Sequence, residues 1–162
     1  MAATYEPIAT SSPSSAASVT FSGISGTYTD LIVVYAMTST TNSNDVFARF
    51  NGDTGSNYSA TRVWGNGTSA LSDRVSNANK VYVDSSGYMS GDGRIALGVF
   101  QVMSYANSNV YKTVLANAGA AAGGVDRVVS LWRSTSAVTS VEIFPAAGTM
   151  SGTISLYGIK AA

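Results

Sequence analysis

The chain of 162 residues contains no cysteine and no histidine. The absence of cysteine excludes disulfides, thiolate nucleophiles, and zinc or iron–sulfur centres held by cysteine. The absence of histidine excludes the Ser-His-Asp mechanism, metal sites with imidazole ligands, and the side chain that most often acts as a general base near neutral pH. Catalysis would have to rest on carboxylates or lysines. The sequence therefore predicts a protein that is not an enzyme and that uses no cofactor or metal.

Charged residues are scarce as well. They make up 11% of the chain, and nine basic and nine acidic residues cancel to a net charge of zero. This share is less than half of the roughly 25% that is usual in a soluble domain. Without a basic patch, neither nucleic acid nor an anionic membrane is expected as a partner. A surface with so little charge does little to keep neighbouring molecules apart, so self-association or docking on a larger body is expected.

Long apolar segments are also missing. The longest apolar run, Leu31 to Met37, is far too short to cross a bilayer. The N-terminal string MAATYEPIATSSPSSAAS has neither the basic region nor the apolar region of a signal peptide. We therefore expect a protein that is soluble when it is synthesised.

The chain consists instead of short runs of β-branched, aromatic and apolar residues, separated by clusters of Gly, Asn, Asp and Ser. Apolar and polar residues alternate in these runs, as they do in strands, and no window keeps a helical stripe beyond two turns. Strands at this spacing predict an all-β protein, an antiparallel β-sandwich of the jelly-roll type. The expected strands cover residues 18–22, 30–38, 46–50, 59–65, 79–84, 94–105, 110–119, 127–134, 140–145 and 153–160.

Two runs, Leu31 to Met37 and Ile95 to Met103, are apolar on both alternating faces. This pattern is typical of strands that are buried on both sides, so we expect them to lie partly in the core and partly in a subunit interface. The runs 94–105 and 110–119 are separated by an Asn/Ser turn, which predicts a hairpin.

The first 17 residues are rich in Ser, Ala and Pro and show no periodicity. They predict an extended N-terminal arm, followed by a single sandwich domain over residues 18–162. Tyr5, Pro7 and Ile8 give the arm an apolar tip. We expect these three residues to lie along a neighbouring molecule.

The string NGDTGSN at 51–57 contains Asp53-Thr54-Gly55, the tripeptide that supplies the catalytic carboxylate in aspartic proteases. Such a protease needs two aspartates that share a proton, and the chain has no second copy of the tripeptide. The aspartate also follows a turn dipeptide, Asn51-Gly52. We therefore predict a structural turn in which Asp53 and Asn57 bond to the local backbone. A calcium site is not favoured, because the loop lacks a closing bidentate glutamate.

The two glutamates and the aromatic residues leave one alternative open. Glu6 and Glu142 do not form a pair by sequence, so solvated charge is favoured over a glycosidase. Aromatic residues that lie in or beside the turns could stack on sugar rings, and Tyr58, Trp64 and Tyr88 are the candidates for such a surface. Burial in the core or in a subunit interface is the favoured interpretation, since Trp and Tyr are enriched there.

Several stretches, taken together, resemble a group of virion proteins of tailed bacteriophages. They are YEPIAT (5–10), SVTFSGISGTYTDLIVV (18–34), RFNGDTGSNYS (49–59), LWRSTSAVTSVEIFP (131–145) and LYGIKAA (156–162). The group consists of small accessory structural proteins, and similar modules occur at the ends of tail fibres. The resemblance implies a role in assembly and implies no catalytic residues.

The resemblance and the length of the chain lead to a particular expectation. No room is left for a tail-fibre shaft, so a capsid decoration (cement) protein is expected on the outside of the virion. It would act as a homotrimer that binds the major capsid protein and stabilises the capsid. The alternative is a tail fibre or tail accessory protein that binds a host surface glycan or another tail protein, with Tyr58, Trp64 and Tyr88 as contacts.

Overall fold

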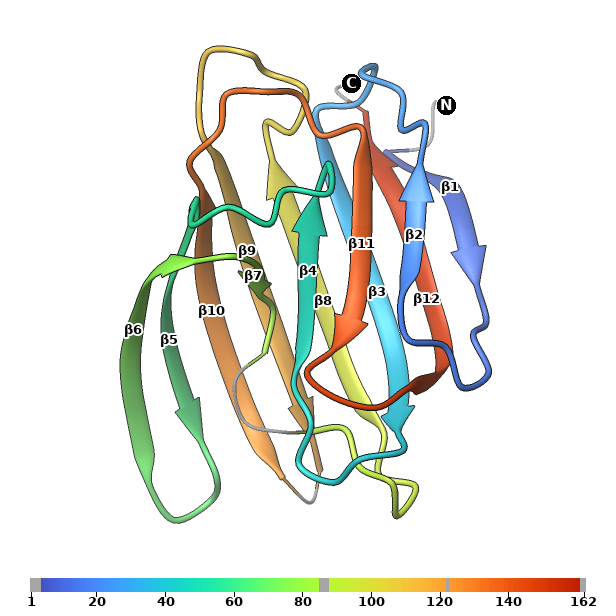
Figure 1. Cartoon of the computed structure of the whole chain (residues 1–162), viewed down its shortest axis with the longest axis vertical. Coiled ribbons are helices and arrows are strands. Elements are labelled where there is room, and N and C mark those ends of the chain that lie inside the picture. Colours follow the sequence, from blue (N-terminus) through green and yellow to red (C-terminus); the bar gives the residue numbers. More distant parts are fainter. Residues whose placement is uncertain (1–3, 85–87, 122, 161–162) are drawn as a thin grey trace.

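The computed structural model describes residues 4–84, 88–121 and 123–160, and every regular element in them is a β-strand (Figure 1). The strands form an eight-stranded sheet, in the order β1-β12-β3-β8-β9-β10-β5-β6, and a four-stranded sheet, in the order β2-β11-β4-β7. Both sheets are antiparallel and pack face to face as a jelly-roll-like β-sandwich, as the sequence predicts. The strands are β1 (Tyr5–Ser11), β2 (Val19–Ser22), β3 (Asp30–Ser39), β4 (Val46–Phe50), β5 (Tyr58–Gly65), β6 (Ala70–Ala78), β7 (Val81–Tyr82), β8 (Ala96–Met103), β9 (Lys112–Ala120), β10 (Gly124–Trp132), β11 (Ser140–Pro145) and β12 (Met150–Ile159).

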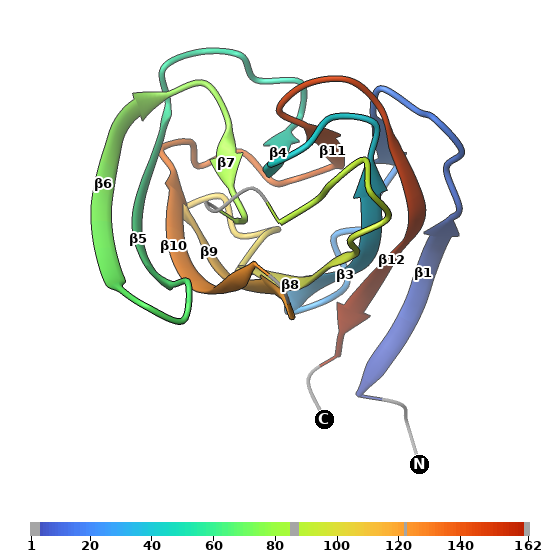
Figure 2. The same cartoon turned by 90° about the horizontal axis from the view of Figure 1, so that it is seen from below.

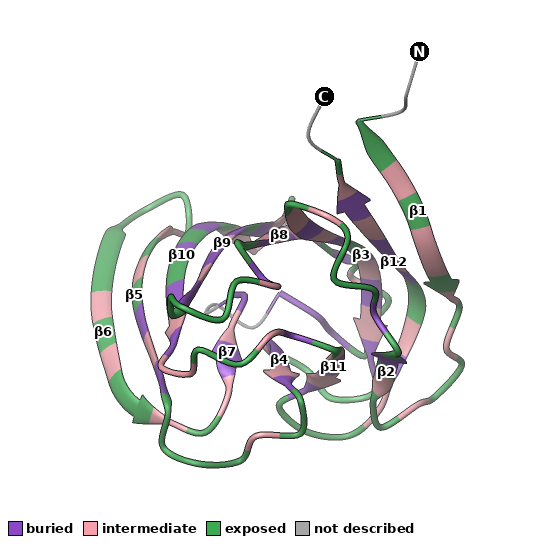
Figure 3. Ribbon diagram, turned by 90° about the horizontal axis from the view of Figure 1, so that it is seen from above, coloured by how far each residue is buried: buried purple, intermediate pink, exposed green. Residues whose placement is uncertain are grey.

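The ten expected strands are all present, with bounds that differ by a few residues, and the expected β8–β9 hairpin is confirmed. The structure adds β1 and β6 at the two edges of the eight-stranded sheet. β6 escapes detection by pattern because most of its residues are exposed on both faces (Figure 3), so nothing forces apolar and polar residues to alternate. Nowhere in the described part of the chain is there a helix with the length and apolarity needed to cross a membrane.

The N-terminal segment differs from the separate arm expected for residues 1–17. Tyr5–Ser11 are extended, but they pair along β12 as the edge strand β1 of the sandwich itself. Pro7 is tolerated there because an edge strand can lack one N–H, and the register shifts between Pro7 and Ala9. The segment is therefore part of the domain; residues 1–3 lie outside the described residues.

The core lies between the two sheets and follows the alternation of the strands. On β3, the side chains of Leu31, Val33 and Met37 are wholly buried against the four-stranded sheet. Val34, which points the other way, is 44% exposed. In the single chain β3 is therefore buried on one side only, and the burial on both sides that its sequence indicates is not present.

Lys112 begins β9 and is wholly buried, although lysine is normally exposed. Its Nζ donates hydrogen bonds to the backbone oxygens of Asn107 (2.6 Å), Val110 (2.7 Å) and Thr135 (3.1 Å). Burial lowers the pKa of Lys112. The amine thus ties the turn between β8 and β9 to the segment that follows β10.

Gly98 makes room for the largest side chain of β3. Tyr35 is 2% exposed and is paired across the sheet with Gly98 of β8. A Cβ atom added at Gly98 would lie 2.1 Å from Cζ of Tyr35, so any larger residue would displace the ring. The absence of a side chain at 98 is thus what allows the tyrosine to lie across β8.

We predict that Gly98→Ala destabilises the fold by about 1–3 kcal/mol, the usual cost of overpacking a core. Gly26→Ala is the matched control, because a Cβ there would meet Ala106 at an ordinary 3.8 Å. Urea unfolding of both variants measures the difference. Equal stability of the two variants would contradict the account given for Gly98.

Candidate functional site

The loop that contains Asp53-Thr54-Gly55 joins β4 to β5 and is fastened to the sandwich. The Asp53 carboxylate accepts hydrogen bonds from the backbone N of Gly55 (2.8 Å), from Nδ2 of Asn57 (2.9 Å) and from the indole Nε1 of Trp132 (2.7 Å). The first bond confirms the predicted bond of Asp53 to the local backbone, whereas the Asn57 side chain, also expected to bond to backbone, donates to the Asp53 carboxylate instead. The third comes from β10 and could not be seen in the local sequence.

The electrostatics of Asp53 fit this structural role. Partial burial alone would raise the pKa of Asp53, but the hydrogen bonds from Trp132, Asn57 and Gly55 outweigh it and hold the pKa below its usual value. The ionised form is therefore favoured in the folded chain. A carboxylate that donors surround in this way serves as an anchor and is poorly suited to exchange a proton with a substrate.

Other carboxylates are paired with cations. Glu142 points outward from β11, as expected, and lies 2.8 Å from Nη1 of Arg49. Glu6 contacts Nζ of Lys160, and Asp73 binds the guanidinium of Arg62 through both of its oxygens. Among the residues that the structure describes, no three Asp or Glu side chains gather in a way that could hold a metal ion.

Asp84 is a buried acid that the sequence did not single out. It is wholly buried, and its Oδ1 accepts a hydrogen bond from the backbone N of Val46 at 2.8 Å. Burial, and next the nearby charge of Asp45, raise the pKa of Asp84 well above its usual value. The bond holds the start of β4 to the segment after β7, which is a structural role.

The aromatic surface considered as a glycan site does not form. Tyr58 and Tyr88 are both wholly buried, and Trp64 alone of the three is partly exposed. Tyr58 stacks on Trp132 with ring centroids 6.2 Å apart, inside the core. The alternative of Tyr58 and Tyr88 as ligand contacts is therefore wrong, and the favoured interpretation, burial in the core, is confirmed for these two residues.

A different surface has the features of a contact site. It is the face of the eight-stranded sheet that is turned away from the four-stranded sheet, which we call the outer face. Its central strands carry apolar side chains, and the two most exposed are Val125 (68%) and Leu97 (59%). The apolar side chains that lie on it include Ile32, Val34, Val63, Leu97, Val99, Leu115, Val125 and Val129.

The strand register orders this surface into rows. One row crosses five strands and consists of Thr153, Ala36, Leu97, Gly119 and Val125, each paired with the next. Small and large side chains therefore alternate along it. We call its four inner members, Ala36, Leu97, Gly119 and Val125, the alternating row.

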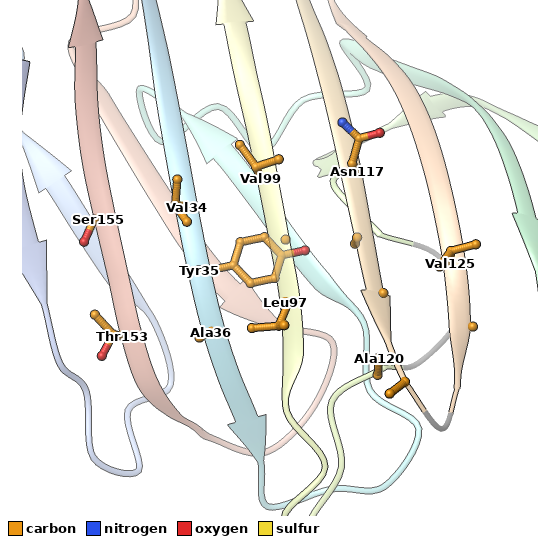
Figure 4. Close-up of a pocket in the computed structure, with 15 residues that line it drawn as sticks. Val34, Tyr35, Ala36, Leu97, Val99, Asn117, Ala120, Val125, Thr153 and Ser155 are labelled. Atoms are coloured by element: carbon orange, nitrogen blue, oxygen red, sulfur yellow. The ribbon is translucent and has the colours of Figure 1, made fainter. Parts of the chain in front are cut away.

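The alternating row lies in an open depression of about 730 Å³ (Figure 4). Its polar side chains are the amide of Asn117 and the hydroxyls of Thr153 and Ser155, and none of its lining residues is charged. A depression of this kind offers apolar contact and a few hydrogen bonds. No carboxylate, lysine or arginine lies among its lining residues beside the hydroxyls of Thr153 and Ser155.

Comparisons with known proteins add little about this surface. No family model matches the chain, and no curated protein matches it. The galectin LEC-6 of Caenorhabditis elegans is similar with a TM-score of 0.37 and 11% identity, over 94% of this chain and 95% of the galectin. A protein of unknown function from Shewanella oneidensis MR-1, SO2946, is similar with a TM-score of 0.26 and 10% identity, over 98% of this chain and 71% of that protein. Likenesses this low carry no argument about function.

We predict that Asp53→Asn destabilises the fold at pH 7 by about 1–2 kcal/mol, because an amide cannot accept all the bonds that the carboxylate accepts. The lowered pKa of Asp53 gives a stabilisation that is present above the unfolded value, near 3.9, and lost as the pH falls through the folded value. The difference between wild type and variant should therefore shrink below about pH 4. Thermal unfolding from pH 7 to pH 3 measures it.

Thr54→Ala is the control for this prediction, since Thr54 lies in the same loop and its side chain is exposed. It should change the stability by less than about 0.5 kcal/mol at either pH. A constant difference between Asp53→Asn and wild type across this range would show that the charge of Asp53 is not what matters.

Proposed function

We propose that this protein is a non-enzymatic structural protein of a tailed-phage virion, a capsid decoration protein that binds the outer surface of the capsid and stabilises it. The observation that carries the proposal is the broad apolar outer face, with an uncharged depression at its centre. Monomeric soluble proteins rarely expose apolar surface of this extent unless it contacts a partner. Such a protein acts by contact rather than by chemistry.

Two further features support this role. The carboxylates described above bond to backbone groups, an indole or cations, which leaves them poorly placed for catalysis. The resemblance of five stretches of the sequence to virion proteins of tailed phages supports a place in the virion. Many copies, each with a modest apolar contact, would together resist the pressure of packaged DNA.

The partners in this proposal are the major capsid protein and further copies of the chain. β1 is the element available to the capsid protein, because it is an edge strand whose outer side has unpaired backbone groups. Tyr5 is 56% exposed on it and Pro7 is also exposed. Ile8 packs against the core, so among the three expected contact residues it contributes mainly to the fold.

The tail alternative is weaker as a proposal. It relied on a cluster of exposed aromatic residues, and two of its three members lie in the core. The position of the protein in the virion separates the two roles directly.

We expect a C-terminally tagged copy of this protein to give density on the outer surface of the capsid in cryo-EM maps of purified virions. Density on the tail would overturn the decoration role while leaving a structural role. Absence from purified virions would overturn the whole proposal.

We further predict that Tyr5→Ser lowers the affinity for capsids about tenfold, since an exposed aromatic residue at an interface is worth roughly 1–2 kcal/mol. Tyr111→Ser is the matched control, because Tyr111 is similarly exposed, at 52%, in the turn before β9. Co-sedimentation with capsids that lack the protein measures both affinities. Equal binding by the two variants would exclude β1 as the capsid contact.

A further inference from the structure

We infer that the outer face binds a second copy of this chain, face to face, about a two-fold axis that runs along the strands between β8 and β9. The inference deepens the proposed function and rests on it only for the expectation that copies of the chain associate. The second copy is identified as the partner by three properties of the outer face: the order of its large and small side chains, its few charges and its area.

The alternating row of one copy is complementary in shape to the same row of a second copy. Its order across the sheet is Ala36, Leu97, Gly119, Val125, which is small, large, small, large. A two-fold axis between β8 and β9 places the row of one copy opposite the row of the other copy in the opposite order. Leu97 of each copy then meets Gly119 of the other, and Val125 of each copy meets Ala36 of the other. Every large side chain faces a small one, which is the packing that a close apolar interface needs.

The depression provides the space that this packing requires. Gly119 has no side chain and forms part of its floor between Leu97 and Val125, and the Val125 side chain leans toward it, since a Cβ at 119 would lie 3.3 Å from Cγ1 of Val125. Leu97 and Val125 are also the two most exposed large apolar side chains among the described residues. Leu97 and Val125 would therefore lose the most apolar surface in the pair.

The shape of the whole sheet agrees with this axis. β5 and β6 curl toward the four-stranded sheet, whereas the ends of β1 and β12 project to the opposite side (Figure 2). The two-fold axis brings β12 of one copy opposite β5 of the other. The projecting side of each copy therefore meets the receding side of its partner, as sheets packed face to face require.

The charges on the outer face do not oppose the pair. The rows through Leu97 and Val99 contain a single charged residue, Arg127, near one side. The axis places Arg127 opposite Val34 of the other copy, where its stem can lie on apolar surface while the guanidinium reaches solvent. Like charges are thus not brought together at the centre.

The area is close to what a stable pair needs. Six strands, from β12 to β5, lie about 4.8 Å apart, and about seven residues of each contribute at roughly 3.3 Å per residue. The flat area is therefore about 650 Å² per copy, and side chains add to it. A standard protein interface buries about 800 Å² per partner.

The test is the mass of the purified full chain by sedimentation equilibrium. We expect the mass to rise with concentration from 16.6 kDa to twice that value. A chain that stays at 16.6 kDa at all concentrations would overturn the inference, and so would a mass three times that value. A trimer, the state expected from the sequence, would show that the face does not pair by a two-fold axis.

Leu97→Asp should raise the dissociation constant of the pair at least about a hundredfold, because a buried leucine is lost on both sides of the axis. Val110→Asp is the control, since Val110 is a similarly exposed apolar residue in the turn before β9 and should leave the constant unchanged. At a concentration where the wild type is a single chain, both variants should unfold at the wild-type temperature. A pair that survives Leu97→Asp would overturn the inference.

A pair of substitutions at Ala36 and Val125 can distinguish an interface in which side chains fit together from one that is only apolar. Ala36→Val adds apolar surface but fills the place that Val125 of the other copy would occupy. It should therefore raise the dissociation constant about tenfold. Combined with Val125→Ala it restores the fit, so the double variant should return to within about threefold of wild type. Tighter association of the single variant would contradict a fitted pair.

The two proposals fail in different ways. Pairing in solution without binding to capsids would leave the two-fold pair standing and remove the decoration role. Binding to capsids by a chain that never pairs would do the reverse.

Discussion

The sandwich has two layers, a sheet of eight strands and a sheet of four, so each sheet is covered by the other on one face only. Burial of apolar side chains between the sheets is the main favourable term in the folding of such a domain. The inner face of β3 shows this plainly, with Leu31 and Val33 wholly buried. The outer face of the same strands is also apolar, but no further layer of the described chain covers it. The core and the candidate contact surface are thus the two faces of the same apolar strands in a two-layer fold.

The chain has few charged residues, and two of its carboxylates, Asp53 and Asp84, have structural roles. Asp53 holds a loop to Trp132 of β10, and Asp84 holds the start of β4. Groups that would attract attention as catalytic residues are thus used to fasten loops and strand ends. The hydrogen bonds to Asp53 hold its pKa below the usual value, so the ionisation of Asp53 contributes to the fold, whereas burial raises the pKa of Asp84 and disfavours its charged form. The tripeptide Asp53-Thr54-Gly55 thus has a structural role, because Asp53 holds the loop between β4 and β5 to Trp132.

The sequence predicted those features that depend on neighbouring residues. Alternation located the central strands, and the Asn-Gly dipeptide located the turn before Asp53, because both patterns arise within a few residues. The edge strand β6 has few buried side chains and so has little alternation. Burial of Tyr58 but not Trp64 depends on which strand ends lie over the core. The alternating row requires the register of four strands, which is set by pairings between distant segments.

β12 lies between β1 and β3 in the eight-stranded sheet, although it is the last strand in the chain. On the ribosome, the first and third strands therefore emerge long before the strand that joins them. Until residues 150–159 have left the exit tunnel, β3 keeps one edge unpaired and β1 has no partner in the sheet. Open edges of this kind invite pairing with other chains. Closure of the sheet must therefore wait until residues 150–159 have emerged, and nascent chains are most exposed to mispairing in that interval.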